Sequence, residues 1–220
     1  MQTLNRLIEK YFIIYRTSDS IGDQFLITSV LQKIFERYNR SIIIFSFYKD
    51  LFLHHPHAYK VINYKNITDN EAEFLFQTKD LTEDEKKSRM TLLINSIQKN
   101  RNKSQYIHYF HTPWMNKENA HIKKSLVEFY SQGLDIDINP YKPELYLHQN
   151  EKLKFKQKFN LPEKFYIIHS EGPMGIKNYG VERIQKIVDN TKDKIKWIQV
   201  GIESDTKLDN IELNLCGKIS

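Results

Sequence analysis

The sequence predicts an α/β protein with two lobes, each built around a parallel β-sheet. Three observations support this fold class. Short apolar runs alternate with segments whose apolar residues follow a helical period. Both halves of the chain open with a strand, a polar turn and a helix. A stretch with two prolines and little helical periodicity, residues 133–150, lies between the halves. With 40% hydrophobic and 27% charged residues, the composition is ordinary for a globular protein, so we expect an ordered core.

The first half opens with a strand–helix–strand unit. Residues 11–16 are apolar and aromatic until Arg16, which is typical of a buried strand, and residues 41–47 form a second such run. Because a helix separates the two runs, we expect the strands to be parallel. The apolar residues of that helix share one face: Leu26, Ile27, Val30, Leu31, Ile34, Phe35 and Tyr38.

Weaker patterns complete the first half and the second half. In order, we predict a strand at 59–64, a helix at 83–98, a strand at 105–110, a helix at 118–132, a helix at 150–159, a strand at 164–169, a helix at 181–190, and strands at 195–201 and 211–217. The break in this pattern predicts three regions: a first lobe at 1–140, a linker at 141–160 and a second lobe at 161–220.

Composition narrows the possible locations and partners. A single cysteine, Cys216, fits a reducing compartment, and no apolar run reaches the 18 or so residues of a membrane helix, so we expect a cytoplasmic protein. The net charge is +6, but the lysines are scattered and the densest basic patch, residues 99–103, reads as a solvated loop. We therefore expect no nucleic-acid partner. The histidines at 54, 55 and 57 lack ligand spacing, so we expect no metal site.

The polar turn after the first strand is the first candidate site. Ligands of open α/β sheets bind at the carboxyl ends of strands. Gly22 allows a ligand to approach the backbone closely, and Asp23 lies at the start of the helix. A structural alternative stays open: Asp23 caps the helix, a role that Ser20 fills equally well.

The second half carries a similar junction. The loop at 170–180 follows a strand, opens a helix and contains three glycines and Lys177, which together suit an anionic phosphate. Glu203 and Asp205 follow the strand at 195–201, where a carboxylate can accept hydrogen bonds from a ribose. A structural alternative stays open: Lys177, Glu203 and Asp205 are ordinary solvated residues of surface loops.

Three stretches together resemble a known family. "IIYRTSDSIGDQFLITSVLQKIFERY", "KFYIIHSEGPMGIKNYGVERIQKIVD" and "WIQVGIESD" are similar to the bacterial heptosyltransferases, glycosyltransferase family 9. The resemblance implies a GT-B fold with two Rossmann-like lobes. It also implies transfer of a heptose or related sugar from a nucleotide-sugar, an ADP-sugar, to a lipopolysaccharide-core or other glycolipid acceptor. No further cofactor is implied, and any membrane contact would be peripheral, at the inner face of the bacterial inner membrane.

The resemblance also assigns roles to single residues. Asp23 matches the catalytic base, with Ser20 and Gly22 in the same acceptor-side turn. Lys177 matches the lysine that binds the donor phosphates, with Ser170 in its loop. Glu203 or Asp205 matches the acidic residue at the nucleotide ribose.

Some features depart from the family pattern. Ser170 replaces a usual proline, and Tyr179-Gly180 replaces a usual Trp-Pro. The chain also stops at "LCGKIS", before the remaining strands and a His-bearing donor segment of the family. We therefore expect a C-terminally truncated, incomplete second lobe, with association through its open sheet as one consequence. The alternative to an enzyme is a non-catalytic remnant or glycan-binding module without a complete donor site.

Overall fold

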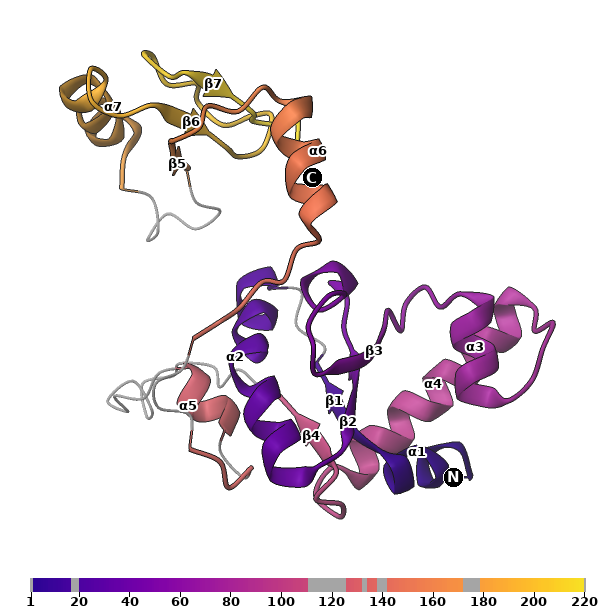
Figure 1. The fold of residues 1–220 in the computed structure, drawn as a ribbon. Coiled ribbons are helices and arrows are strands. Elements are labelled where there is room, and N and C mark those ends of the chain that lie inside the picture. Colours follow the sequence, from indigo (N-terminus) through magenta and orange to yellow (C-terminus); the bar gives the residue numbers. More distant parts are fainter. Residues whose placement is uncertain are drawn as a thin grey trace. The chain divides into compact units, whose positions relative to one another are not determined.

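The computed structural model describes residues 2–16, 20–110, 126–131, 134–137, 142–171 and 179–219. The chain divides into two compact units, unit 1 (Met1–His148) and unit 2 (Gln149–Ser220). Each unit contains its own parallel sheet (Figure 1). The predicted α/β class with two parallel sheets is confirmed.

Four described strands form the sheet of unit 1, in the order β3-β2-β1-β4. They are β1 (Tyr11–Tyr15), β2 (Ser41–Phe45), β3 (Ala58–Ile62) and β4 (Ile107–Tyr109). Every pair is parallel, with Ile13 of β1 opposite Ile43 of β2 and Ile107 of β4. The predicted parallel strand–helix–strand unit at 11–47 is therefore present.

Helices connect these strands and cover both faces of the sheet (Figure 1). They are α1 (Gln2–Lys10), α2 (Ile21–Tyr38), α3 (Asp69–Phe76), α4 (Glu83–Asn100) and α5 (Leu126–Ser131), with a short 3-10 helix, η1 (Lys49–Leu51). The sequence analysis missed α1 and α3. For α3 a local signal exists, since Thr68 and Glu71 form a capping box. Of the helix expected at 118–132, residues 118–125 and 132 lie outside the described residues.

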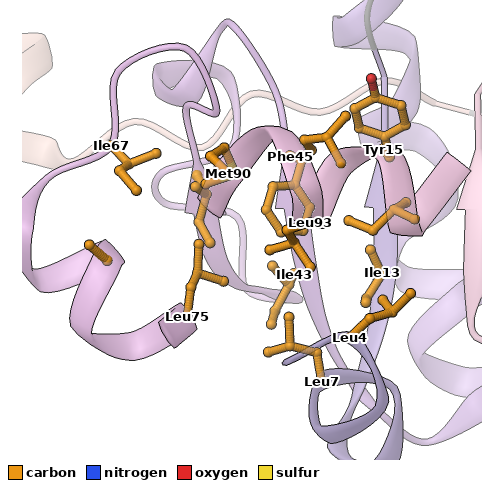
Figure 2. Close-up of a cluster of buried hydrophobic side chains, with 14 of the residues drawn as sticks. Leu4, Leu7, Ile13, Tyr15, Ile43, Phe45, Ile67, Leu75, Met90 and Leu93 are labelled. Carbon is orange, nitrogen blue, oxygen red and sulfur yellow. The ribbon is translucent and has the colours of Figure 1, made fainter. Parts of the chain in front are cut away.

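The alternating directions of strand side chains produce two cores, one on each face of the sheet. Ile13, Ile43 and Phe45 point to the face where α1, α3 and α4 pack, as Figure 2 shows with Leu4, Leu7, Leu75 and Met90. Their neighbours along the strands pack against α2 and the residue Val127 of α5 on the other face: Phe12, Ile14, Ile42 and Ile44. Burial on both faces explains why these strands read as continuous apolar runs.

Unit 2 has a smaller sheet, with three described strands in the order β5-β6-β7. They are β5 (Tyr166–Ile168), β6 (Trp197–Gln199) and β7 (Leu213–Asn214), and both pairs are parallel. The helices are α6 (Gln149–Lys158) and α7 (Val181–Thr191). The core is small: Ile184 and Val188 of α7 pack with Leu208, and Ile168 and Trp197 lie at its border.

None of the helices in the described ranges is both long enough and apolar enough to span a lipid bilayer.

Candidate functional site

The strand order of unit 1 creates a switch point between β1 and β4. From β1 the chain moves to β2 and β3 on one side, and then returns to β4 on the other side of β1. Open α/β sheets bind ligands outside the carboxyl ends of the strands at such a point. The turn that carries Ser20, Gly22 and Asp23 follows β1 and therefore lies at this position.

Ser20 is the N-cap residue of α2. Its backbone is extended, at φ −77° and ψ 112°, and its hydroxyl accepts a hydrogen bond from the backbone N–H of Asp23 at 3.4 Å. The structure thus gives the cap to Ser20, and Asp23 lies in the first turn of the helix. A carboxylate in a first turn is favoured by the helix dipole.

Gly22 is exposed in the first turn of α2. A Cβ atom at this position would meet no atom of the described structure within 4 Å. Neither the conformation nor the packing of the described chain therefore requires a glycine here. The close approach of a ligand to the backbone at Gly22 stays a prediction.

Arg16 directly follows β1 and is only 1% exposed. Its Nη2 donates to Oδ2 of Asp23 at 2.8 Å, and its Nη1 donates to the carbonyl oxygen of Phe110 at 2.5 Å. Phe110 is the first residue after β4, and its own N–H donates to the carbonyl oxygen of Tyr15 in β1. Arg16 therefore joins both strand ends of the switch point to the first turn of α2.

A second buried contact ties the same turn to β2. Gln24, which is fully buried, accepts a hydrogen bond from the hydroxyl of Ser46, the residue after β2. The sequence analysis missed Arg16, Gln24 and Ser46 as parts of the site. Two of these residues carried a signal in the sequence, because each is polar at a position that the apolar pattern predicts to be buried. Arg16 ends an apolar strand, and Gln24 lies beside the apolar stripe of α2.

In unit 2, Gln199 at the end of β6 organises the polar residues. Its side chain is fully buried. Its Nε2 donates to Ser170 Oγ at 3.0 Å and to the carbonyl oxygen of Thr206 at 2.7 Å. Its Oε1 accepts a hydrogen bond from the N–H of Leu208. Ser170 is 1% exposed and also bonds to the Thr206 carbonyl. The predicted donor-binding residue Ser170 is thus a buried part of this hydrogen-bond network.

Asp205 holds a histidine at the end of β5. Its Oδ2 lies 3.1 Å from Nε2 of His169 and accepts a bond from the N–H of Ile202, also at 3.1 Å. The Asp205 side chain is 6% exposed, whereas that of His169 is 47% exposed. Gly201 makes room for this pair, because a Cβ there would lie 1.9 Å from Asp205 Oδ2. Of the two, His169 is therefore the residue that solvent or a ligand reaches.

The remaining predicted residues of unit 2 have different environments. Glu203 is exposed, and its stem lies where a side chain on Gly217 would otherwise project. Glu171, beside Ser170, accepts a hydrogen bond from the N–H of Thr206, and hydrogen bonding from Thr206 lowers the pKa of its carboxyl group. Lys177 lies outside the described residues.

Within the described residues, the histidine, cysteine and acidic side chains form no group of three or more that could hold a metal ion. Each unit is thus characterised by polar residues at strand ends: an Arg–Asp ion pair with a capping serine in unit 1, and a His–Asp pair with a buried glutamine in unit 2.

The chain thus combines two α/β units, each with a parallel sheet and polar residues at its strand ends. Comparison with solved structures finds proteins of similar fold. The chain is similar to the glycosyl transferase family 9 structure from Veillonella parvula DSM 2008, with a TM-score of 0.59, 13% identity, and coverage of 97% of this chain and 71% of that one.

Two Escherichia coli structures are also similar. ADP-heptose LPS heptosyltransferase II matches with a TM-score of 0.53 and 14% identity over 94% of this chain and 73% of that one. The heptosyltransferase WaaC with ADP matches with a TM-score of 0.42 and 12% identity over 86% and 68%. No protein-family model and no curated protein sequence matches the chain. The fold expected from the sequence resemblance is thereby confirmed, and at these identities the likeness is one of fold.

Proposed function

We propose that the protein is a glycosyltransferase that moves a heptose or a related sugar from a nucleotide-sugar, with an ADP-sugar as the expected donor, to a lipopolysaccharide-core or other glycolipid acceptor. The observation that carries this proposal is the position of Asp23. Its carboxylate lies at the switch point of a parallel sheet, on the first turn of a helix, and a buried arginine holds it. The likeness in fold to a glycosyl transferase family 9 structure and to ADP-heptose LPS heptosyltransferase II supports the proposal.

The proposed reaction inverts the anomeric carbon in one displacement. An acceptor hydroxyl attacks that carbon, the bond between the sugar and the diphosphate breaks, and the hydroxyl proton passes to the Asp23 carboxylate. Ser20 and Gly22 border the place of the acceptor. Gly22 leaves space beside the backbone, and the exposed first turn of α2 leaves Asp23 within reach of a hydroxyl.

Unit 2 is proposed to bind the nucleotide diphosphate. Negative charge develops on the leaving diphosphate, and Lys177 with loop N–H groups is proposed to stabilise it. Glu203, with its exposed carboxylate, is better placed than Asp205 to accept a ribose hydroxyl, because Asp205 already holds His169 and a loop N–H. Ser170, which is buried, contributes through its hydrogen bonds with Gln199 and the carbonyl of Thr206.

A glycan-binding module without catalysis is the second candidate. The specific observation in its favour is that Ser170 and Asp205, two of the proposed donor-binding residues, already make hydrogen bonds within unit 2. This candidate keeps acceptor binding at unit 1 and dispenses with sugar transfer.

A transfer assay separates these candidates. The purified full chain is incubated with a radiolabelled ADP-sugar and a lipopolysaccharide-core acceptor, and both labelled glycan and released ADP are measured, with an established heptosyltransferase as positive control. We expect transfer that Asp23→Asn lowers about 10²- to 10⁴-fold, the usual contribution of a general base. The control variant is Asp135→Asn, which removes another Arg-paired carboxylate at the surface of unit 1. Saturable acceptor binding without transfer supports the second candidate, and absence of both overturns the two.

A further inference from the structure

The guanidinium of Arg16 is buried, whereas most arginine side chains lie in solvent. Its side chain is 2% exposed, although it carries a full charge. A buried charge is costly unless it is paired and hydrogen-bonded. Both requirements are met by residues of the switch point: the carboxylate of Asp23 and the carbonyl of Phe110. The structure therefore places a charge in the interior directly behind the proposed catalytic carboxylate.

The geometry of these bonds requires a guanidinium in particular. Nη1 and Nη2 belong to one rigid plane, so the bond to Phe110 fixes the direction in which Nη2 meets Asp23. The strands at both ends of this arrangement are themselves hydrogen-bonded, since Phe110 N–H donates to Tyr15 and Arg16 N–H donates to Phe45. The anchor of Asp23 thus includes the ends of β1 and β4 and not the helix alone.

We propose that Arg16 is a positioning residue for sugar transfer: it holds the Asp23 carboxylate against the ends of β1 and β4, in the orientation in which it receives the acceptor proton. This inference rests on the proposed glycosyltransferase function. Arg16 itself touches no substrate, because it is buried. It acts by removing rotational freedom from Asp23 before the acceptor arrives, and misplacement of a reacting group by about 1 Å can cost on the order of 100-fold in rate.

The first test replaces the planar guanidinium of Arg16 with a group that keeps the positive charge. In Arg16→Lys, a single ammonium group cannot make both bonds in the same directions. We expect kcat to fall about 10- to 100-fold while KM for the acceptor changes less than about 3-fold, because orientation rather than binding is lost. Arg37→Lys is the matched control, since Arg37 also pairs with an aspartate in unit 1, at 2.7 Å, but at the surface. Its kcat should equal that of the wild type.

Chemical rescue gives an independent readout. Arg16→Ala removes the guanidinium from an enclosed site, and added guanidinium ion at millimolar concentration should restore kcat in a saturable manner. Urea has the same planar shape without the charge and should not restore it. If Arg16→Ala does not fold, as judged by circular dichroism, Arg16→Lys alone decides.

The outcomes distinguish this inference from the function on which it rests. A wild-type chain that transfers no sugar overturns the proposed function, and the role of Arg16 falls with it. A wild type that transfers sugar, together with an Arg16→Lys variant of unchanged kcat, overturns only the positioning role. Loss of kcat in Arg16→Lys with a normal Arg37→Lys supports the positioning role.

Discussion

Besides its proposed role as the catalytic base, Asp23 is the counter-ion of Arg16. From the sequence, Asp23→Asn would preserve stability, because asparagine caps helices about as well as aspartate. The structure revises this expectation, since Ser20 provides the cap and Asp23 neutralises a buried cation. We predict that Asp23→Asn lowers the free energy of unfolding by about 1–3 kcal/mol. That is below the range for fully buried pairs, because the Asp23 side chain is 24% exposed.

Urea unfolding of unit 1 measures this loss. Asp135→Asn is the control, and it should change stability by less than about 1 kcal/mol, because its ion pair with Arg37 is exposed. Equal midpoints for wild type and Asp23→Asn would show that the Arg16 ion pair contributes nothing to the fold.

Gly22 offers a test in which stability and function should change in opposite directions. Because a Cβ at this helical position meets open space, Gly22→Ala should raise the free energy of unfolding by about 0.4–1 kcal/mol. If an acceptor approaches the backbone here, the same methyl group should raise the KM for the acceptor. Thermal unfolding and acceptor titration measure the two effects. A more stable variant with unchanged KM would remove Gly22 from the site.

His55 makes the stability of unit 1 depend on pH. It is 4% exposed, and burial, with a smaller contribution from the charge of His57, lowers its pKa to about 4 from an ordinary 6.5. Between these values the unfolded chain binds the proton and the folded chain does not, so stability falls as the pH drops from about 6.5 towards 4. At about 1.4 kcal/mol per pKa unit, the full loss is on the order of 3 kcal/mol.

The contribution of His55 is separated from that of the carboxylates by a variant. His55→Gln removes the titrating ring. Between pH 7 and pH 5 the variant should therefore lose less free energy of unfolding than the wild type, by about 1–2 kcal/mol. Urea unfolding at both pH values provides the numbers. Identical pH dependence in the two proteins would contradict the assignment.

At the scale of elements, the loop after β6 shows how a glycine can be required by its neighbours. Gly201 has a φ of 154°, and a Cβ would lie 1.9 Å from Asp205 Oδ2 and 3.1 Å from the ring of His169. We predict that Gly201→Ala displaces Asp205, breaks its contact with His169 and destabilises unit 2 by more than about 1 kcal/mol.

The readout for this prediction is the chemical shift of the His169 ring, followed over pH, together with thermal unfolding. Gly22→Ala is the matched control, because the same substitution there meets open space. An unchanged His169 signal in Gly201→Ala would show that the loop accommodates a side chain without moving Asp205.

At the scale of the whole molecule, the two units differ in how well their sheets are covered. Strands β1 and β2 of unit 1 are buried on both faces by two clusters of apolar side chains. In unit 2, Tyr166 and Ile167 of β5 are 61% and 62% exposed. Since buried apolar area is the main source of stability, we expect unit 2 to open more readily than unit 1.

Hydrogen exchange on the full chain tests this difference. The amides of β1 and β2 should be protected by at least about 2 kcal/mol more than those of β5 and β6. Equal protection in both sheets would mean that the units unfold together, and stronger protection of β5 would reverse the prediction.

From local patterns alone, the sequence predicted the succession of the main strands and helices along the chain and the parallel pairing of strands separated by a helix. Those features follow from local apolar periodicity, which is visible within ten to twenty residues. It also placed Asp23 at a strand–helix junction, because the turn residues mark that junction directly. The helices α1 and α3 were not predicted, although the capping box of α3, formed by Thr68 and Glu71, was present in the sequence.

The residues that surround the candidate site were visible only in the tertiary structure. Arg16 meets Phe110 across 94 positions of sequence, Ser46 meets Gln24 across 22, and Asp205 meets His169 across 36. The first and third contacts depend on β4 lying beside β1 and β6 beside β5, and the second depends on α2 packing at the end of β2. Periodicity shows which residues are buried but not which strands are neighbours. The partner of a buried polar side chain is therefore fixed by the strand order, and that order is set by packing of the whole unit.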